Sequence, residues 1–389
     1  MCDSPAPVSL VEHFRSVPDP RIHRTRRHNV IDIIVIAVLA VLCGAEDFVS
    51  IEMFGKSKRD WLSERLELPN GIPSHDTFAR VFARLDPEAF QRCFLAWVEA
   101  LRERATIATT RNESIALDGK TLRHSFDTAT GQASIHMVSA WATTHGLVLG
   151  QMKVNEKSNE ITAIPQILKL LDIAGCIVTI DAMGCQKAIA RQIHEQRGEY
   201  VLALKDNQPS LAEGVNLFLE HAEKDGYKDL TTHSLQNVEK DHGRIETRQY
   251  RLIDLPEGIA WRDERALWPG IKSIGVVTST RQIRDKTTTH TRIFISSLSA
   301  ATKRNALRFS KAVRSHWGIE NSLHWVLDMS YAEDACRIRK EHAAQNFAIV
   351  RHITLNLLKL ENTAKAGVKN KRLKAGWDNC YLERVLMPI

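Results

Sequence analysis

Three acidic residues that lie far apart in the chain are the ones whose types could do chemistry together. Asp118 closes a short apolar run in IALDGKTLRHS, and Asp181 closes another in IVTIDAMGCQ. Glu320 lies within RSHWGIENSLHWVLD, whose apolar residues recur at helical spacing. Magnesium and manganese prefer carboxylate oxygens to nitrogen or sulfur ligands. We therefore expect a site for Mg²⁺ or Mn²⁺ built by Asp118, Asp181 and Glu320.

The helix around Glu320 leaves one alternative open. His316, Glu320 and His324 are spaced four residues apart, so on a regular α-helix they form one stripe. Histidines at such spacing are common zinc ligands. A zinc site would leave Asp118 and Asp181 without a role, so the carboxylate site is the favoured hypothesis. Taken singly, either aspartate could simply cap a loop at a strand end.

Strands and helices that could bring the acids together follow Ser114. Apolar runs and turn residues predict strand, strand, strand, helix, strand, helix and strand over residues 115–117, 135–141, 147–154, 159–172, 177–180, 186–197 and 200–204. This α/β pattern is the element order of the RNase H-like fold, a mixed sheet flanked by helices. In that order the first and fourth strands are neighbours, so Asp118 and Asp181 would leave the same sheet edge.

The chain divides into five consecutive parts. We expect a helical N-terminal domain that binds DNA or assists the core, the first part of the RNase H-like core, a β-rich insertion, the second part of the core with the Glu320 helix, and a basic C-terminal tail. The respective residues are 1–105, 106–224, 225–298, 299–360 and 361–389. A length of 389 residues fits more than one domain, since domains commonly contain ~100 to 200 residues.

The basic residues favour a polyanionic partner. The formal net charge of +7 is only a weak indication of nucleic acid for a chain of this length. Clusters and strand-end positions are more informative, because such positions suit phosphate contacts. The candidate DNA-binding residues are Arg26, Arg27, Arg80, Lys120, Lys205, Asn207, Gln208, Arg314, His316, Arg337, Arg339, Lys340, Lys371 and Arg372. Each could instead belong to a solvated surface or a turn.

Cysteine usage and hydropathy indicate a cytoplasmic protein. The seven cysteines include no CxxC pair, which fits a reduced chain and gives no thiolate zinc site. The most apolar run, Ile33 to Cys43, is shorter than the ~20 residues that span a bilayer. We also expect no secretion signal, because the N-terminus lacks a basic segment followed by an apolar core.

Together, the motifs resemble the DDE transposases of bacterial insertion sequences, and within them the H-repeat-associated proteins found with Rhs elements. The resemblance runs nearly end to end and is carried, in order, by DPRIHRTRRH, AVLCGAEDFVSIEMFGKSK, LPNGIPSHDTFARVF, LDGKTLRHS, EKSNEITAIPQIL, VTIDAMGCQ, YVLALKDNQ, ISSL and HWGIENSLHWVLD. It implies an RNase H-like catalytic domain with the acidic triad Asp118, Asp181 and Glu320, and a β insertion before the last acid.

The sequence departs from the wider superfamily around its glutamate. Where that superfamily often has a tyrosine, an arginine and a lysine, this chain has Val313, His316 and Leu327. His316 and Arg314 could take over a phosphate contact, and the basic cluster at Arg337 could supply positive charge.

The resemblance implies a transposase that acts in DNA recombination. Such an enzyme cuts phosphodiester bonds at the ends of its element and joins the 3′ ends to target DNA with two magnesium or manganese ions. Its partners would be double-stranded DNA, both terminal inverted repeats and target, and a homodimer or larger synaptic oligomer would pair two ends in the nucleoid. Two alternatives stay open: a catalytically inactive DNA-binding remnant, and a metal-dependent nuclease without strand transfer.

Overall fold

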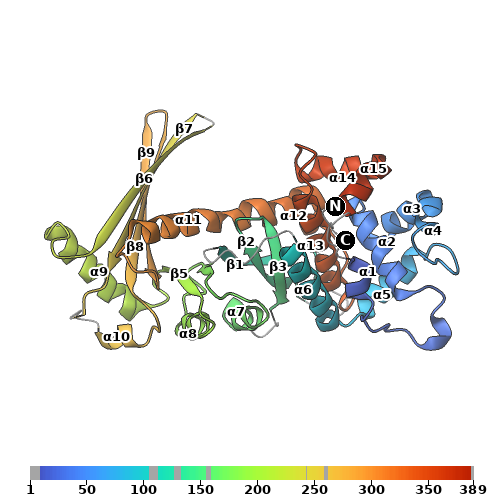
Figure 1. The fold of residues 1–389 in the computed structure, drawn as a ribbon, viewed down its shortest axis with the longest axis horizontal. Coiled ribbons are helices and arrows are strands. Elements are labelled where there is room, and N and C mark those ends of the chain that lie inside the picture. Colours follow the sequence, from blue (N-terminus) through green and yellow to red (C-terminus); the bar gives the residue numbers. More distant parts are fainter. Residues whose placement is uncertain are drawn as a thin grey trace, which may run out of the picture. The chain divides into compact units, whose positions relative to one another are not determined.

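The strands of the chain form one mixed sheet (Figure 1). The computed structural model describes residues 9–104, 113–126, 133–154, 159–241, 243–257 and 262–386. Within these ranges the strand order is β3-β2-β1-β4-β5-β9-β8-β7-β6. The strands are β1 (Ser114–Leu122), β2 (Ile135–Ala142), β3 (Leu147–Lys153), β4 (Ile177–Ile180), β5 (Glu199–Leu204), β6 (Thr232–Asp241), β7 (Arg244–Asp254), β8 (Ser273–Ile283) and β9 (Lys286–Ser296).

The first five strands confirm the RNase H-like order that the sequence predicts. Strand β1 pairs in parallel with β4, and β4 pairs in parallel with β5, whereas β2 and β3 are antiparallel. The expected β-rich insertion is present, and it continues the same sheet, because β9 pairs antiparallel with β5 from Val201↔Ser296 to Leu204↔Ile293. Strands β8, β7 and β6 then follow as antiparallel neighbours.

The chain forms two compact units that do not follow chain order. Unit 1 comprises residues 1–108, 119–157 and 320–389, and unit 2 comprises residues 109–118 and 158–319. Strand β1 therefore contributes to both units, with the change after Asp118. The expected boundary between residues 105 and 106 lies outside the described residues.

Unit 1 confirms the helical N-terminal region and adds C-terminal helices to it. Its helices are α1 (Leu10–Phe14), η1 (His23–Thr25), α2 (Val30–Leu42), α3 (Phe48–Ser57), α4 (Arg59–Ser63), α5 (His75–Arg84), α6 (Pro87–Arg104), η2 (Glu320–His324), α12 (Trp325–Tyr331), η3 (Glu333–Ala335), α13 (Ala343–Leu360), α14 (Val368–Trp377) and α15 (Asn379–Leu386). Helix α13 is buried over most of its length and packs against α2, α5, α6 and β3. It is the centre of this unit's core.

A buried asparagine joins α13 to the edge of the sheet. The side chain of Asn356 accepts from the backbone N–H of Val148 at 2.8 Å and donates to the carbonyl of the same residue at 2.9 Å. These bonds satisfy polar groups that edge strand β3 could not pair with another strand. Asn346 does the same for the end of α5, donating to the carbonyls of Phe82 and Leu85 at 2.9 Å each.

The C-terminal segment differs from the expected basic tail. It folds into α14 and α15, and the side chains of Lys371 and Arg372 point inward and are buried. Arg372 donates to the carbonyls of Val41 and Ala45 at 2.7 and 3.1 Å, at the end of α2. Lys371 donates to the carbonyl of Leu358 at 2.9 Å, near the end of α13. Both cations satisfy carbonyls that a helix leaves unpaired at its C-terminus, where positive charge is favourable.

Unit 2 packs helices on both faces of its part of the sheet. Its helices are α7 (Glu160–Lys169), α8 (Lys187–Glu195), α9 (Pro209–Lys224), α10 (Arg262–Ala266) and α11 (Lys303–Ile319). Ile177 belongs to the core cluster that contains Phe309 and Val313 of α11. Gly275 permits this close packing, since a Cβ there would lie 2.2 Å from Phe309 Cζ. Helix α11 is thus fixed to one sheet face.

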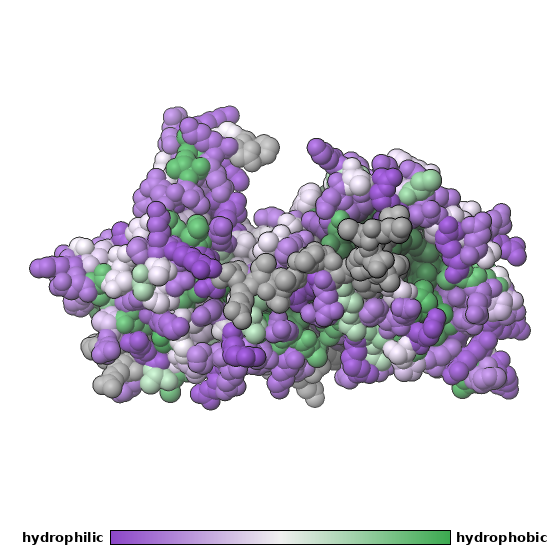
Figure 2. All heavy atoms as spheres, viewed as in Figure 1, coloured by the Kyte–Doolittle hydropathy of each residue, from purple (hydrophilic) through white to green (hydrophobic). Residues whose placement is uncertain are grey.

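The surface is more polar than the cores of the two units. The visible face is mostly hydrophilic, with apolar residues in small areas (Figure 2). Within the described ranges, none of the helices combines the length and the apolar character that a bilayer-spanning helix needs.

Candidate active site

Asp118 and Asp181 follow paired positions on two neighbouring parallel strands of unit 2. The last register pair between β1 and β4 is Leu117↔Ile180, and the next residues along the two strands are the two aspartates. Neighbouring strands lie ~4.8 Å apart, so the backbones of the two aspartates lie side by side. The structure therefore makes these two predicted residues neighbours, but only Asp181 follows a strand end. The prediction that Asp118 closes the first strand is wrong, because β1 continues to Leu122 beyond its pairing with β4.

The turn after β4 fixes one oxygen of Asp181. Its Oδ1 accepts the backbone N–H groups of Met183 at 3.0 Å and Gly184 at 3.3 Å. Gly184 is needed for this turn, because a Cβ there would lie 2.2 Å from Ile180 Cγ2. The carboxylate is held at a defined position by these two backbone donors.

Two predicted DNA contacts instead support this turn. Asn207 Nδ2 donates to the Ala182 carbonyl at 2.5 Å, and Gln208 Nε2 donates to the Cys185 carbonyl at 3.0 Å. Both side chains therefore position the backbone that follows Asp181. Lys205, which precedes them after β5, is exposed.

His316 differs most from its expected role. Its Nδ1 shares a hydrogen bond of 2.9 Å with Thr179 Oγ1, two residues before Asp181. Burial, together with the Arg292 cation, lowers the pKa of His316 to about 4. A neutral imidazole provides no charge for a phosphate, so His316 fastens α11 to β4. Its neighbour Arg314 is exposed and makes an ion pair of 3.2 Å with Glu239.

Glu320 is exposed and begins a π-helical segment, η2. This segment follows α11 directly, and the chain changes from unit 2 to unit 1 between Ile319 and Glu320. A π-helical turn breaks the four-residue stripe with His316 and His324 on which the zinc alternative depends, and such turns are frequent at functional sites. In the part of the chain that the structure describes, no three His, Cys, Asp or Glu side chains are grouped to hold a metal ion.

Lys120 also differs from its expected role as a DNA contact. Its Nζ makes ion pairs with Asp328, with Glu333 at 2.8 Å and with Asp334 at 3.7 Å, all in unit 1. Burial alone would lower the pKa of Lys120, but the carboxylates of Glu333 and Asp328 raise it by more, so the net pKa lies above its usual value. Its charge is therefore already neutralised within the protein.

Glu333 is the fully buried partner in this cluster and is poorly suited as a metal ligand. Burial raises its pKa, but Lys120 and Arg351 lower it more, so the net pKa lies below the usual range. Arg351 Nη1 lies 3.4 Å from Glu333 Oε1. Both carboxylate oxygens thus face cations of the protein.

The other predicted cations are exposed. Among the residues that the structure describes, they are Arg26, Arg27, Arg80, Lys205, Arg314, Arg337, Arg339 and Lys340. Arg26 is partly engaged, since its Nε donates to the Arg21 carbonyl at 2.9 Å and lies 3.5 Å from Asp19.

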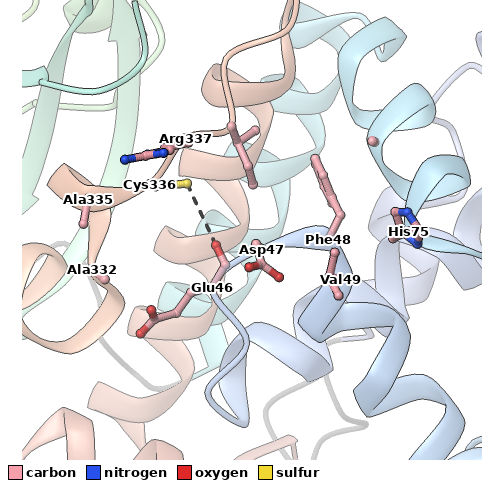
Figure 3. Close-up of a pocket in the computed structure, with 11 residues that line it drawn as sticks. Glu46, Asp47, Phe48, Val49, His75, Ala332, Ala335, Cys336 and Arg337 are labelled. Atoms are coloured by element: carbon pink, nitrogen blue, oxygen red, sulfur yellow. Dashed lines mark hydrogen bonds between the residues drawn. The ribbon is translucent and has the colours of Figure 1, made fainter.

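Sequence reasoning missed a cavity of unit 1. It has a volume of about 450 Å³ and lies between the start of α3, α5 and the segment after η3 (Figure 3). Its lining includes Asp47, Phe48, His75 and Arg337, and Cys336 Sγ donates to the Glu46 carbonyl at 3.9 Å. No sequence motif marks it, because its walls come from three separate segments. Its mixture of acids, one arginine and apolar groups selects no single ligand.

Comparison with known proteins identifies the family. The model described as "Transposase DDE domain" matches residues 109–357, and the model described as "DDE_Tnp_1-associated" matches residues 11–98. The first match covers more than half of the chain. The protein belongs to the DDE transposase family.

Curated relatives support the assignment at full length. "H repeat-associated putative transposase YhhI" of Escherichia coli strain K12 is 40% identical over 380 residues, 97% of each chain. "Putative transposase YncI" of Escherichia coli O157:H7 is 40% identical over 97% of this chain and 94% of its own length. A shorter relative, "Inactive transposase YbfQ" of strain K12, is 40% identical over 19% of this chain and 89% of its own length.

A solved structure of a piggyBac transposase synaptic complex with hairpin DNA matches more distantly. The match covers 98% of this chain and 77% of the other chain at 11% identity, with a TM-score of 0.38. At that level it carries no argument about this chain, and the family assignment depends on the sequence matches.

Proposed function

We propose that this protein is an active transposase that cleaves phosphodiester bonds at the ends of an insertion sequence and transfers the 3′ ends to target DNA. The observation that carries the proposal is that Asp118 and Asp181 directly follow Leu117 and Ile180, the last register pair of the neighbouring parallel strands β1 and β4. A divalent cation bound by both carboxylates would relieve the repulsion between them. Membership of the DDE transposase family agrees with that arrangement.

The donor set fits magnesium or manganese. Asp118, Asp181 and Glu320 would supply oxygen ligands only, which hard divalent cations prefer. Asp118 would serve both ions, with Asp181 on one and Glu320 on the other. When bound, the two ions supply Lewis-acid stabilisation for the charge that develops on the phosphate oxygens.

The protein's own groups orient this site. Met183 and Gly184 fix one oxygen of Asp181, and the bond between Thr179 and His316 holds the end of α11 against β4. Glu320 lies four residues, about one helical turn, after His316. Because His316 is fixed to β4 and the family motif contains this glutamate, we propose that Glu320 is the third ligand.

DNA would contact the exposed cations. Arg26, Arg27 and Arg80 in the helical N-terminal region would hold the terminal repeats, and Arg337, Arg339 and Lys340 follow the Glu320 segment in the chain. Such phosphate contacts position the duplex without reading its sequence. Two element ends must be paired for transposition, so we propose a homodimer or larger synaptic oligomer.

A nicking assay with Asp118→Asn tests the function. The substrate is a labelled duplex that contains the element end, with Mg²⁺ or Mn²⁺. We expect nicking to fall about 10³-fold, because loss of a metal ligand removes several kcal/mol of stabilisation, and DNA binding to stay within about twofold. Asp285→Asn is the matched control, since Asp285 is an exposed acid in the β8–β9 turn; it should nick normally.

The other possible outcomes would refute the triad or favour one of the two alternative functions. Nicking by Asp118→Asn at the normal rate would refute the triad. Binding of end DNA by the unaltered protein without any nicking would favour a catalytically inactive remnant. Nicking without linkage of the labelled 3′ end to a target plasmid would favour a metal-dependent nuclease.

A further inference from the structure

Lys120 is the mostly covered centre of an ionic cluster that lies entirely in unit 1. Only 11% of its side chain is exposed, and the carboxylates of Asp328 and Glu333 both contact its Nζ. Glu333 is 2% exposed and is shared with Arg351 of α13, which is 3% exposed. We define the Lys120 cluster as Lys120, Asp328, Glu333, Asp334 and Arg351.

The cluster connects two segments of unit 1, and each of these segments begins at or beside a predicted metal ligand. The chain enters unit 1 after Asp118 and again at Glu320. Lys120 follows the first entry by two residues, and Asp328 follows the second by eight, in α12. One ammonium group therefore ties β1 to the helix that begins shortly after Glu320.

Helix α12, which carries Asp328, is itself held in place by contacts with α13 and α14. Tyr331, the last residue of α12, is buried, and Thr354 Oγ1 of α13 donates to its hydroxyl at 3.2 Å. Arg372 of α14 donates to the carbonyl of Ser330. Lys120 thus binds to a segment that the core helix and α14 hold in place.

Buried ionic contacts of this kind contribute orientation more than stability. Moving charges out of water costs several kcal/mol, and well-packed apolar residues are often as stabilising. An ammonium with two carboxylate partners, however, accepts few arrangements, whereas an apolar contact could slide. Residues that orient metal ligands from behind typically change metal affinity or activity by about 10- to 100-fold when they are replaced.

We propose that Lys120 is a positioning residue for the metal site. Through Asp328 and Glu333 it holds the segment that follows Asp118 and the segment that follows Glu320 in one arrangement, so that both carboxylates can serve the same pair of cations. This inference rests on the proposed function of those carboxylates. It replaces a direct contact between Lys120 and DNA.

The test compares Lys120→Met, Lys120→Arg and Asp328→Asn. Lys120→Met leaves the buried Glu333 with Arg351 alone and risks misfolding, whereas Asp328→Asn keeps Glu333 paired with Lys120. Arg123→Met is the matched control, because Arg123 pairs with Asp334 of the same cluster at 3.2 Å but is 77% exposed. Exposed ion pairs contribute little, so this control should behave like the unaltered protein.

Three measurements separate positioning from DNA contact. They are the affinity for end DNA without metal, the Mn²⁺ dependence of the nicking rate, and Mn²⁺ binding to the free protein followed by electron paramagnetic resonance. We expect Lys120→Met and Asp328→Asn to bind DNA normally, to need more Mn²⁺ and to nick about 10- to 100-fold more slowly. Lys120→Arg, which keeps the charge, should recover most of the rate.

Two results would overturn the inference. One is loss of DNA affinity in Lys120→Met with an unchanged Mn²⁺ midpoint, which would make Lys120 a phosphate contact. The other is normal nicking and normal Mn²⁺ binding in folded Lys120→Met or Asp328→Asn. If the unaltered protein never nicks, the proposed function fails, but Mn²⁺ binding by the free protein still tests whether Lys120 is a positioning residue. Binding that depends on Asp118 and weakens in Lys120→Met would support positioning, and its absence would refute it.

Discussion

Replacement of Arg372 by methionine tests whether this cation is structural or contacts DNA. Its guanidinium donates to the carbonyls of Val41, Ala45 and Ser330, and the side chain is buried. A hydrogen bond with a charged partner contributes roughly 1.5–3 kcal/mol. The bonds share one group and are not additive, so we expect Arg372→Met to lower the free energy of unfolding by about 3–5 kcal/mol.

The assay has a stability arm and a DNA arm. Urea unfolding followed by tryptophan fluorescence gives the change in stability, and the affinity for end DNA is measured from low to moderate salt on protein that is still folded. Arg384→Met on α15 is the matched control. Arg384 is exposed and its Nη1 donates to Thr363 Oγ1 at 3.2 Å, so little stability should be lost.

The DNA arm can refute the reasoning directly. A phosphate contact would show as weaker binding and a salt slope reduced by about one. If Arg372→Met changed the slope in this way while its unfolding free energy fell by less than about 1 kcal/mol, the buried placement of Arg372 would be wrong. The expected result is an unchanged slope with a large loss of stability.

Two further predictions concern His316 and Asn356. The pKa of His316 is about 4 in the folded protein against 6.5 without burial, so its contribution to stability is present above pH ~6.5 and is lost as pH falls towards 4. Between pH 7.5 and 4.5, the free energy of unfolding measured in urea should fall by about 2 kcal/mol less in His316→Gln than in the unaltered protein. An equal fall in both proteins would contradict the low pKa of His316. Asn356→Ala should lower the unfolding free energy by about 2–4 kcal/mol, because it leaves the buried N–H and carbonyl of Val148 unpaired. Asn237→Ala on exposed β6 is its control, and a similar small loss in both would contradict the bridging role.

The order of strands and the placement of two acids could be predicted from sequence. The short apolar run before Asp181 marks the end of β4, whereas β1 continues past Asp118 to Leu122. The succession of strands and helices restricts the topology to few choices. The π-helical turn at Glu320 was not predictable in this way. Its sequence has regular helical spacing, which predicts an uninterrupted α-helix, and π-helical segments are rare.

The roles of the cations needed the tertiary structure. Lys120, Lys371 and Arg372 look like surface charges in the sequence, but Lys371 and Arg372 are buried against carbonyls and Lys120 is mostly covered and paired with carboxylates. Their partners lie 10 to 331 residues away along the chain, so no local pattern reveals them. Asn207 and Gln208 likewise meet the turn after Asp181 only through the pairing of β4 with β5.

The sequence by itself determined the family, the order of the strands and the carboxylate that follows β4, because apolar periodicity and short motifs are local properties. Only the tertiary structure decided which polar groups are available to a ligand. That depends on burial and on partners from distant segments, which neutralise Lys120 and lower the pKa of His316. Asp118 and Asp181 are neighbours because β1 and β4 pair in register, which no local pattern in the sequence can establish.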